Sequence, residues 1–221
     1  LSISGEPDGT TVTYTGNNKT DAGTYTVTAL VSQPNYKDTT LTATLTILKA
    51  DAVITANAVQ KYTADGTVKN VIATLNHTED TLSYSPQQGY AAAGTYEITV
   101  SADSTKNYKP VSKKVSLIIE NATFSGLVFE DKEVTYNGQP YAILLTGKPE
   151  EATITYTGND KTDAGIYSIT ALVKRPNYKD TTLTAKLTIL KADAIITANA
   201  VQKYTADGTV KNVIATLNHT E

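Results

Sequence analysis

A lysine, an aspartate and a tyrosine recur together in this chain and could act as an acid–base group or bind a cation. They lie in KTDAGTY at Lys19–Tyr25 and in KTDAGIY at Lys161–Tyr167. A third copy, AAAGTY at Ala91–Tyr96, keeps the glycine and the tyrosine but has Ala92 in the place of the aspartates. Because the charges change between copies, we interpret the motif as a structural corner, in which aspartate shapes the turn and glycine permits it.

The corner begins a strand at its tyrosine. We expect each tyrosine ring to be buried and its hydroxyl to bond to nearby backbone, as in a tyrosine corner. The predicted structural residues are Gly23, Tyr25, Gly94, Tyr96, Gly165 and Tyr167.

Other reactive constellations are missing from the sequence. His77 and His219 each lie in a polar NHTE segment without a neighbouring histidine or cysteine, which is typical of a solvated turn residue. NDKTDAG at 159–165 lacks the ligand spacing of a calcium loop. The chain has no cysteine, no phosphate-binding glycine loop and no Ser-His-Asp set. We therefore predict no catalytic residue, no cofactor, no metal site and no enzyme activity.

Three tyrosines in PNYK or KNYK segments, Tyr36, Tyr108 and Tyr178, are candidate glycan contacts. A tyrosine offers an apolar face and a polar tip to a sugar ring. Their presence in both types of repeat also fits a packing role at the open end of the core, so both interpretations stay open.

The chain is built from repeats. Residues 143–221 match residues 1–79 almost letter for letter, which gives a period of 142 residues from Asp21 to Asp163. Gly23, Gly94 and Gly165 lie 71 positions apart, so each long period contains two repeats of different type. We predict the back part of one repeat at 1–49, complete repeats at 50–120 and 121–191, and the front part of a further repeat at 192–221.

Alternating apolar and polar residues predict strands nearly throughout. TYTVTALV at 24–31 and LTATLTI at 41–47 are typical of sheets with one buried face. The Asn-Gly of YNGQP and the Asp-Gly of YTADGTV predict hairpins. We predict an all-β protein of tandem small Ig-like β-sandwich domains, with β-grasp repeats as the alternative. The junction TILKADAVIT has no flexible linker, so one strand should run straight into the next and give a rod-like array.

Composition limits the partners. The formal net charge is −3 and no cluster of Lys or Arg is present, so nucleic acid is not expected. No apolar run reaches the roughly 18–20 residues that span a bilayer, so we expect no membrane insertion in this segment.

VTYNGQP, ITYTGNDKTDAGIYSITA, PNY and LTAKLTILKA together resemble the MBG-type tandem repeat domains of bacterial surface adhesins. The resemblance is strongest at 121–191 and 1–49, which we call KTDAG-type repeats. Residues 50–120 and 192–221 depart from it, with YTADGTVKN in place of the YNGQP opening, and we call them divergent repeats. The resemblance implies an extracellular protein at the bacterial cell surface or cell wall.

Our leading hypothesis is a structural stalk or fibre of an adhesin, whose partners are the neighbouring repeats of the array. The alternative is direct binding of host glycan or mucin. A third hypothesis is self-assembly into a filament, in which front and back parts of repeats complement each other between molecules.

Overall fold

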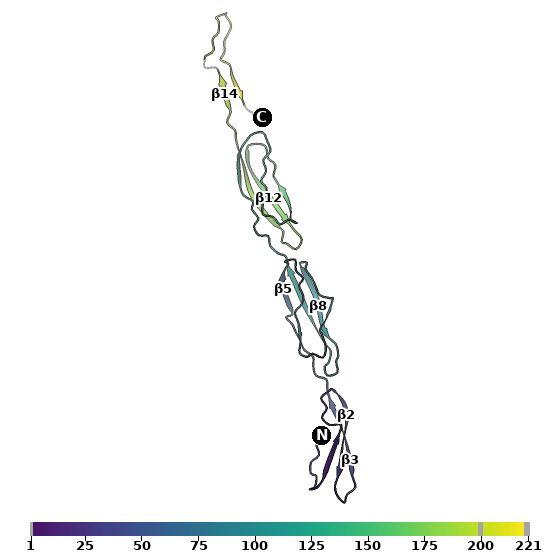
Figure 1. Ribbon diagram of the computed structural model, residues 1–221. Coiled ribbons are helices and arrows are strands. Elements are labelled where there is room, and N and C mark those ends of the chain that lie inside the picture. The colour runs from purple at the N-terminus through teal and green to yellow at the C-terminus, as the bar shows by residue number, and fades with distance from the viewer. Residues whose placement is uncertain (1, 199–200, 219–221) are drawn as a thin grey trace. The chain divides into compact units, whose positions relative to one another are not determined.

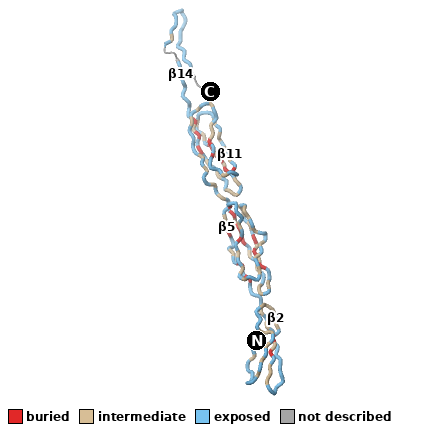
Figure 2. Tube along the Cα trace, in the orientation of Figure 1, coloured by how far each residue is buried: buried red, intermediate tan, exposed pale blue. Residues whose placement is uncertain are grey.

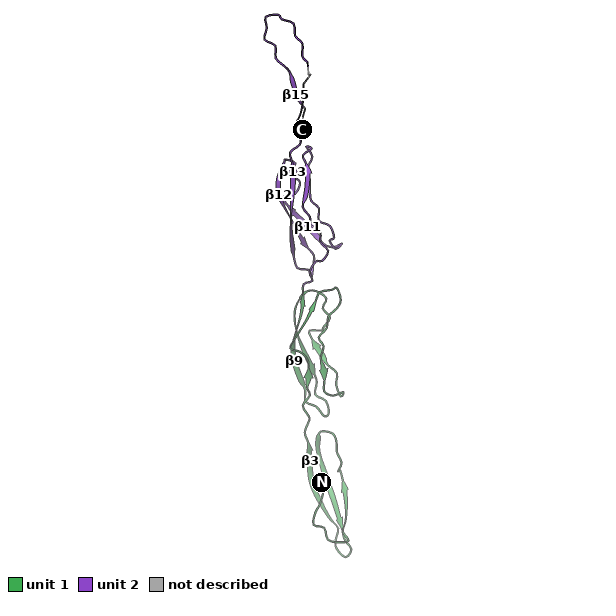
Figure 3. Ribbon diagram, turned by 90° about the vertical axis from the view of Figure 1, so that its left-hand side faces the viewer, with its two compact units in different colours: residues 1–120 green, residues 121–221 purple. Residues whose placement is uncertain are grey.

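The computed structural model describes residues 2–198 and 201–218, which form two compact units, 1–120 and 121–221 (Figures 1 and 3). Strands, turns and irregular segments make up all the described residues, and none of these residues is helical. The predicted all-β class and the small β-sandwich domains are confirmed. A β-grasp sheet packs against a helix, so that alternative is wrong for the described part of the chain.

The first unit contains two sheet systems. Residues 1–49 form an antiparallel three-stranded sheet, β1-β2-β3, and residues 50–120 form a four-stranded sheet, β5-β9-β8-β7, with a two-stranded sheet, β4-β6. The strands are β1 (Thr11–Thr15), β2 (Gly23–Ser32), β3 (Thr39–Ile47), β4 (Ile54–Thr55), β5 (Val59–Thr63), β6 (Thr74–Leu75), β7 (Ser83–Ser85), β8 (Gly94–Ala102) and β9 (Val111–Glu120).

The second unit, like the first, contains a four-stranded sheet. Its four-stranded sheet has the order β10-β13-β12-β11, and a separate hairpin-like pair joins β14 and β15. The strands are β10 (Lys132–Thr135), β11 (Thr153–Thr157), β12 (Gly165–Lys174), β13 (Thr181–Leu190), β14 (Ile195–Ala198) and β15 (Ala215–Asn218).

Each complete repeat is a two-layer sandwich with a small core. In the divergent repeat, Ile98 of β8 and Leu117 of β9 are fully buried and face Ile54 of β4. In the KTDAG-type repeat, Ile169 and Leu187 are buried in the same way against Ile143 of the opposite layer. The buried positions concentrate in these two complete repeats (Figure 2). The alternation read from TYTVTALV predicted the buried Val27 and Ala29 correctly, whereas Leu41 of LTATLTI, which it placed on the buried face, is exposed.

An early strand of each complete repeat pairs in parallel with the last strand. β5 lies beside β9, with Gln60 opposite Leu117, and β10 lies beside β13, with Val134 opposite Ile189. Backbone bonds extend the first ladder, since Ser116 N donates to Ala58 O at 2.8 Å and Ala64 N donates to Glu120 O at 2.9 Å. Periodicity predicts strands but not their partners, so this closure was not foreseen.

The hairpin predicted at Asp65-Gly66 does not form between the strands next to the turn. β5 and β6 flank the Asp-Gly turn but pair with β9 and β4, respectively, and not with each other. The Asp65 carboxylate accepts a bond from Thr67 N at 2.9 Å, and Gly66 has φ 83°, so the turn is closed by a side chain. Such a turn carries the chain from one layer of the sandwich to the other.

Amide side chains hold the segment that follows this turn. Gln60 Nε2 donates to Ile72 O at 2.8 Å, and Ile72 N donates to Gln60 Oε1 at 2.9 Å. Asn159 bonds in the same two-way manner to Ile143 in the KTDAG-type repeat, with both distances 2.9 Å. One amide side chain thus replaces a strand partner for a segment that lacks one.

The sequence predicts that one strand runs straight through the junction between repeats, but the junction is not a continuous strand. β3 ends at Ile47 and β4 begins at Ile54. Between them, Ala50 forms an isolated parallel bridge with Tyr108, and Ala122 forms the same bridge with Tyr178 in the second unit. The connecting residue is therefore held by the repeat that it enters, without an intervening strand.

Candidate functional site at the joint between two repeats

The three tyrosine corners share one geometry. Each tyrosine hydroxyl donates to the backbone carbonyl four residues upstream, at 2.9 Å: Tyr25 to Asp21, Tyr96 to Ala92 and Tyr167 to Asp163. The rings are half-buried, so the expectation of full burial is wrong, while their hydroxyls are satisfied. The bonded atom is a backbone oxygen, which explains why alanine serves as well as aspartate.

The glycines make room for the folded-back rings. A Cβ at Gly23 would lie 3.0 Å from the hydroxyl oxygen of Tyr25, and one at Gly94 would lie 3.1 Å from that of Tyr96. Gly165 stands in the same relation to Tyr167, also at 3.1 Å. These contacts support the structural role proposed for the six corner residues.

The lysine of the motif covers the tyrosine ring. Lys19 Nζ lies 5.3 Å from the ring centre of Tyr25, and Lys161 Nζ lies 5.4 Å from that of Tyr167. Tyr90 occupies the matching position of the divergent repeat and stacks on Tyr96, with ring centroids 3.8 Å apart. A cation and a ring both pack well on an aromatic face, so the lysine has a packing role that sequence reasoning missed.

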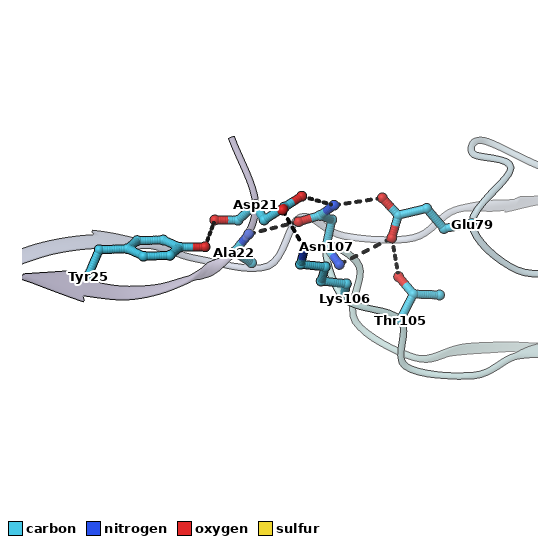
Figure 4. Close-up of polar contacts among 7 residues, drawn as sticks. All are labelled: Asp21, Ala22, Tyr25, Glu79, Thr105, Lys106 and Asn107. Carbon is cyan, nitrogen blue, oxygen red and sulfur yellow. Dashed lines mark hydrogen bonds and ion pairs between the residues drawn. The ribbon is translucent and has the colours of Figure 1, made fainter. Parts of the chain in front are cut away.

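The Asp21 carboxylate reaches the next repeat instead of shaping its own turn (Figure 4). Asn107 Nδ2 donates to Asp21 Oδ1 at 3.1 Å, and Lys106 forms an ion pair with Asp21 Oδ2. The backbone joins in, since Ala22 N donates to Asn107 Oδ1 at 2.7 Å. The aspartate that resembled a reactive group is thus a contact between the repeats at 1–49 and 50–120.

A second carboxylate, from the divergent repeat, meets the same asparagine. Asn107 Nδ2 donates to Glu79 Oε1 at 2.8 Å, and Thr105 Oγ1 donates to Glu79 Oε2, also at 2.8 Å (Figure 4). Asn107 N donates to Glu79 Oε2 at 3.2 Å. Asn107 therefore uses its amide nitrogen and oxygen to hold two repeats at once, in a group that we call the joint cluster: Asp21, Ala22, Glu79, Thr105, Lys106 and Asn107.

Backbone and lysine contacts frame the joint cluster. Ala50 N donates to Asn107 O at 2.8 Å, and Lys109 N donates to Ala50 O at 2.9 Å. Lys49 Nζ donates to Ser104 Oγ at 2.8 Å and to Thr105 O at 2.6 Å. The loop from 104 to 109 is therefore tied to the connecting segment as well as to the corner of the preceding repeat.

The contacts within the joint cluster favour the charged forms of its two carboxyl groups and of its lysine. Hydrogen bonds from Lys106 and Asn107 lower the pKa of the Asp21 carboxyl below its ordinary value. Bonds from Asn107 and Thr105 lower the pKa of Glu79, and the Asp21 carboxylate raises the pKa of Lys106. The group is solvated, so each ion pair contributes modestly.

One histidine and two of the three NY-motif tyrosines pack against other rings, and the third tyrosine does not. His77 is half-buried and stacks on Tyr108 with ring centroids 3.7 Å apart, so its description as a solvated turn residue is wrong. Tyr178 stacks on Phe124, with ring centroids 4.9 Å apart. Tyr36 is 73% exposed and offers a free ring surface. His219 lies outside the described residues.

The arrangement offers contact between protein surfaces more than reaction chemistry. Among residues 2–198 and 201–218, no group of three potential metal ligands converges. No described helix is long and apolar enough to cross a membrane. The joint cluster instead brings two carboxylates, an ammonium group and an amide from two repeats into one hydrogen-bonded set.

Comparison with known sequences decides the family. The sequence profile of the MBG domain matches residues 2–51 and 127–193, just over half of the chain. The chain belongs to the MBG domain family. The two MBG matches fall on the KTDAG-type repeats, so the resemblance to MBG-type repeats of surface adhesins is confirmed. No curated protein sequence matches the chain significantly.

Solved structures with some likeness to this MBG protein are distant. Protocadherin Gamma B2 extracellular cadherin domains 3-6 are 11% identical, with a TM-score of 0.31 over 88% of this chain and 66% of that one. Drosophila N-cadherin EC1-3 is 9% identical, with a TM-score of 0.34 over 87% and 92%. A SusE-like surface located polysaccharide binding protein from Bacteroides thetaiotaomicron is 10% identical, with a TM-score of 0.29 over 86% and 37%.

Proposed function

We propose that this MBG chain is a non-catalytic part of the repetitive stalk or fibre of an extracellular bacterial adhesin, attached to the cell surface or cell wall. The observation that carries the proposal is the direct coupling of successive repeats. Asn107 of the repeat at 50–120 is bonded to Ala22 and Asp21 of the preceding corner, and Lys106 forms an ion pair with Asp21. Direct bonds between successive repeats restrict how one repeat can turn relative to the next, and a stalk requires such restriction.

Immunogold labelling of intact cells of the source organism, with antibodies against residues 1–221, tests the location. We expect gold particles on unpermeabilised cells, at a distance from the envelope. Labelling that appears only after permeabilisation would contradict the surface role. A deletion of 142 residues, one full period, should bring the gold particles closer to the envelope while adhesion persists.

Direct glycan or mucin binding is the second candidate, and the exposed ring of Tyr36 is the observation that favours it. The rings of Tyr108 and Tyr178 are stacked on His77 and Phe124, which supports packing at those two positions. A glycan array probed with the whole chain separates the candidates. Silence supports the stalk, whereas a signal that Tyr36→Ala removes supports binding. Self-assembly by strand complementation stays a prediction.

A further inference from the structure

Two residues of the joint cluster differ together between the repeat types. The position of Asp21 is Ala92 in the divergent repeat and Asp163 in the second KTDAG-type repeat. The position of Lys106, which precedes the asparagine of the NY motif, is Pro176 in the second KTDAG-type repeat. A corner with a carboxylate therefore belongs to one repeat type, and a loop with an ammonium group belongs to the other.

The fold of each repeat does not explain these two side chains. The corner of the KTDAG-type repeat uses the backbone oxygen of Asp21 for the tyrosine bond, and Ala92 supplies the same atom in the divergent repeat. The Asp21 carboxylate bonds instead to Asn107 and Lys106 of the neighbouring repeat. Its chemistry is directed at that neighbour.

We propose that the corner of a KTDAG-type repeat is a selective docking surface for a divergent repeat. It accepts a loop that carries Thr-Lys-Asn beside a glutamate, as at Thr105, Lys106, Asn107 and Glu79. A loop with Arg-Pro-Asn, as at 175–177, lacks the ammonium group that pairs with the aspartate. The selectivity concerns which repeat adjoins which, and it goes beyond the stalk because it holds wherever the protein is located.

The second corner of this type presents the same groups. Asp163 is exposed, the Tyr167 hydroxyl is bonded to its backbone oxygen at 2.9 Å, and Lys161 covers the Tyr167 ring. The corner sequence KTDAG is unchanged from the first copy. Asp163 is therefore the second copy of the docking surface, with a divergent repeat as its partner.

Spin labels on the full chain test the selectivity. The sequence has no cysteine, so labels can be placed at Thr44→Cys on β3 and Ser112→Cys on β9, both exposed. We expect a narrow distance distribution in the parent chain. Asp21→Ala, Lys106→Ala and the type exchange Lys106→Pro should each broaden it. The charge exchange, Asp21→Lys combined with Lys106→Asp, should bring the distribution most of the way back to its narrow width in the parent chain.

Amide exchange at Ala22 provides a second readout, because this amide donates to Asn107 Oδ1. We expect exchange about two- to fivefold faster in each single variant, the scale of an exposed ion pair. Asp163→Ala is the matched control and should change neither readout. Unchanged readouts in Asp21→Ala, or a charge exchange that restores nothing, would overturn the proposal. Far-UV circular dichroism identifies any variant that fails to fold.

A longer chain tests the second corner. Residues 191–221 differ from 49–79 only at Val53, which is Ile195, so fusing a copy of residues 80–120 after Glu221 completes a second divergent repeat. The amide of Ala164, the counterpart of Ala22, should then exchange more slowly than in the parent chain, and Asp163→Ala should abolish the difference. Equal exchange in the parent and extended chains would contradict docking at Asp163.

Discussion

Tyr90 stacks on Tyr96 at the position where lysines cover the corner tyrosines of the other repeats, with ring centroids 3.8 Å apart. The two lysines lie at nearly the same distance from their tyrosine rings, with Nζ 5.3 Å from the ring centroid for Lys19 and 5.4 Å for Lys161. The position therefore requires a group that packs on a ring, and either a cation or an aromatic side chain meets that requirement.

We expect Tyr90→Lys to destabilise the divergent repeat by less than about 1 kcal/mol, because lysine already fills this position elsewhere in the chain. Tyr90→Ala leaves the Tyr96 ring uncovered and should cost about 2 kcal/mol. Amide exchange of β8 in the full chain measures both changes. Equal losses in the two variants would show that the covering group does not matter.

The corner glycine should resist even the smallest substitution. Gly94→Ala places a Cβ 3.1 Å from the Tyr96 hydroxyl oxygen, so the ring must move and its bond to Ala92 O weakens. We expect a loss of about 1–2 kcal/mol in the free energy of unfolding of this repeat. In a Tyr96→Phe background the nearest atom is gone, so the same substitution should cost less. An undiminished cost would place the strain elsewhere.

Gln60 should be among the most sensitive polar positions of the divergent repeat. It is 9% exposed and satisfies both backbone groups of Ile72. Gln60→Ala leaves those groups unpaired and should cost about 1–3 kcal/mol. Gln202 makes the same two bonds to Ile214, in a segment whose apolar side chains are exposed. Gln202→Ala is therefore the matched control, and urea unfolding should show a much smaller effect for it.

The joint cluster should weaken in acid. The pKa values of Asp21 and Glu79 lie below their ordinary values of 3.8 and 4.5. A depressed pKa adds stability that is present above the ordinary value and is lost as the pH falls through the lower value of the folded state. The protection factor of the Ala22 amide, which compares its exchange with the intrinsic rate at the same pH, should therefore fall progressively below about pH 4.5.

Carboxyl chemical shifts measured against pH check this prediction directly. Lys106→Ala removes the principal cause of the shift, so the pKa of Asp21 should rise toward its ordinary value in that variant. High salt should act in the same direction by screening the ion pair. An Asp21 carboxyl that titrates at its ordinary value in the parent chain would contradict the assigned contact.

The sequence carried enough information for the repeats, the strands and the corners. Alternation in TYTVTALV placed Val27 and Ala29 inward, and the survival of Gly94 and Tyr96 in the divergent repeat identified the corner as structural. These features are local, or they recur at fixed spacing, so one chain compared with itself reveals them.

Features that depend on distant segments were out of reach. The parallel closure of β5 on β9 joins residues more than 50 positions apart, and periodicity does not specify such a partner. The role of Asp21 depends on Asn107 in another repeat. A signal for it was present, because Asp21 and Lys106 differ together between repeat types, but comparing single positions one at a time conceals it.

The parallel closure of each complete repeat also determines how it would bear a mechanical load. In the repeat at 50–120 the chain enters at Ala50, passes through β4 and then β5, and leaves at the end of β9, and β5 and β9 are parallel neighbours. Tension applied through the two ends therefore pulls the strands in opposite directions along their own length. Their hydrogen bonds are then loaded in shear, all together, whereas an unzipping geometry would break them one after another.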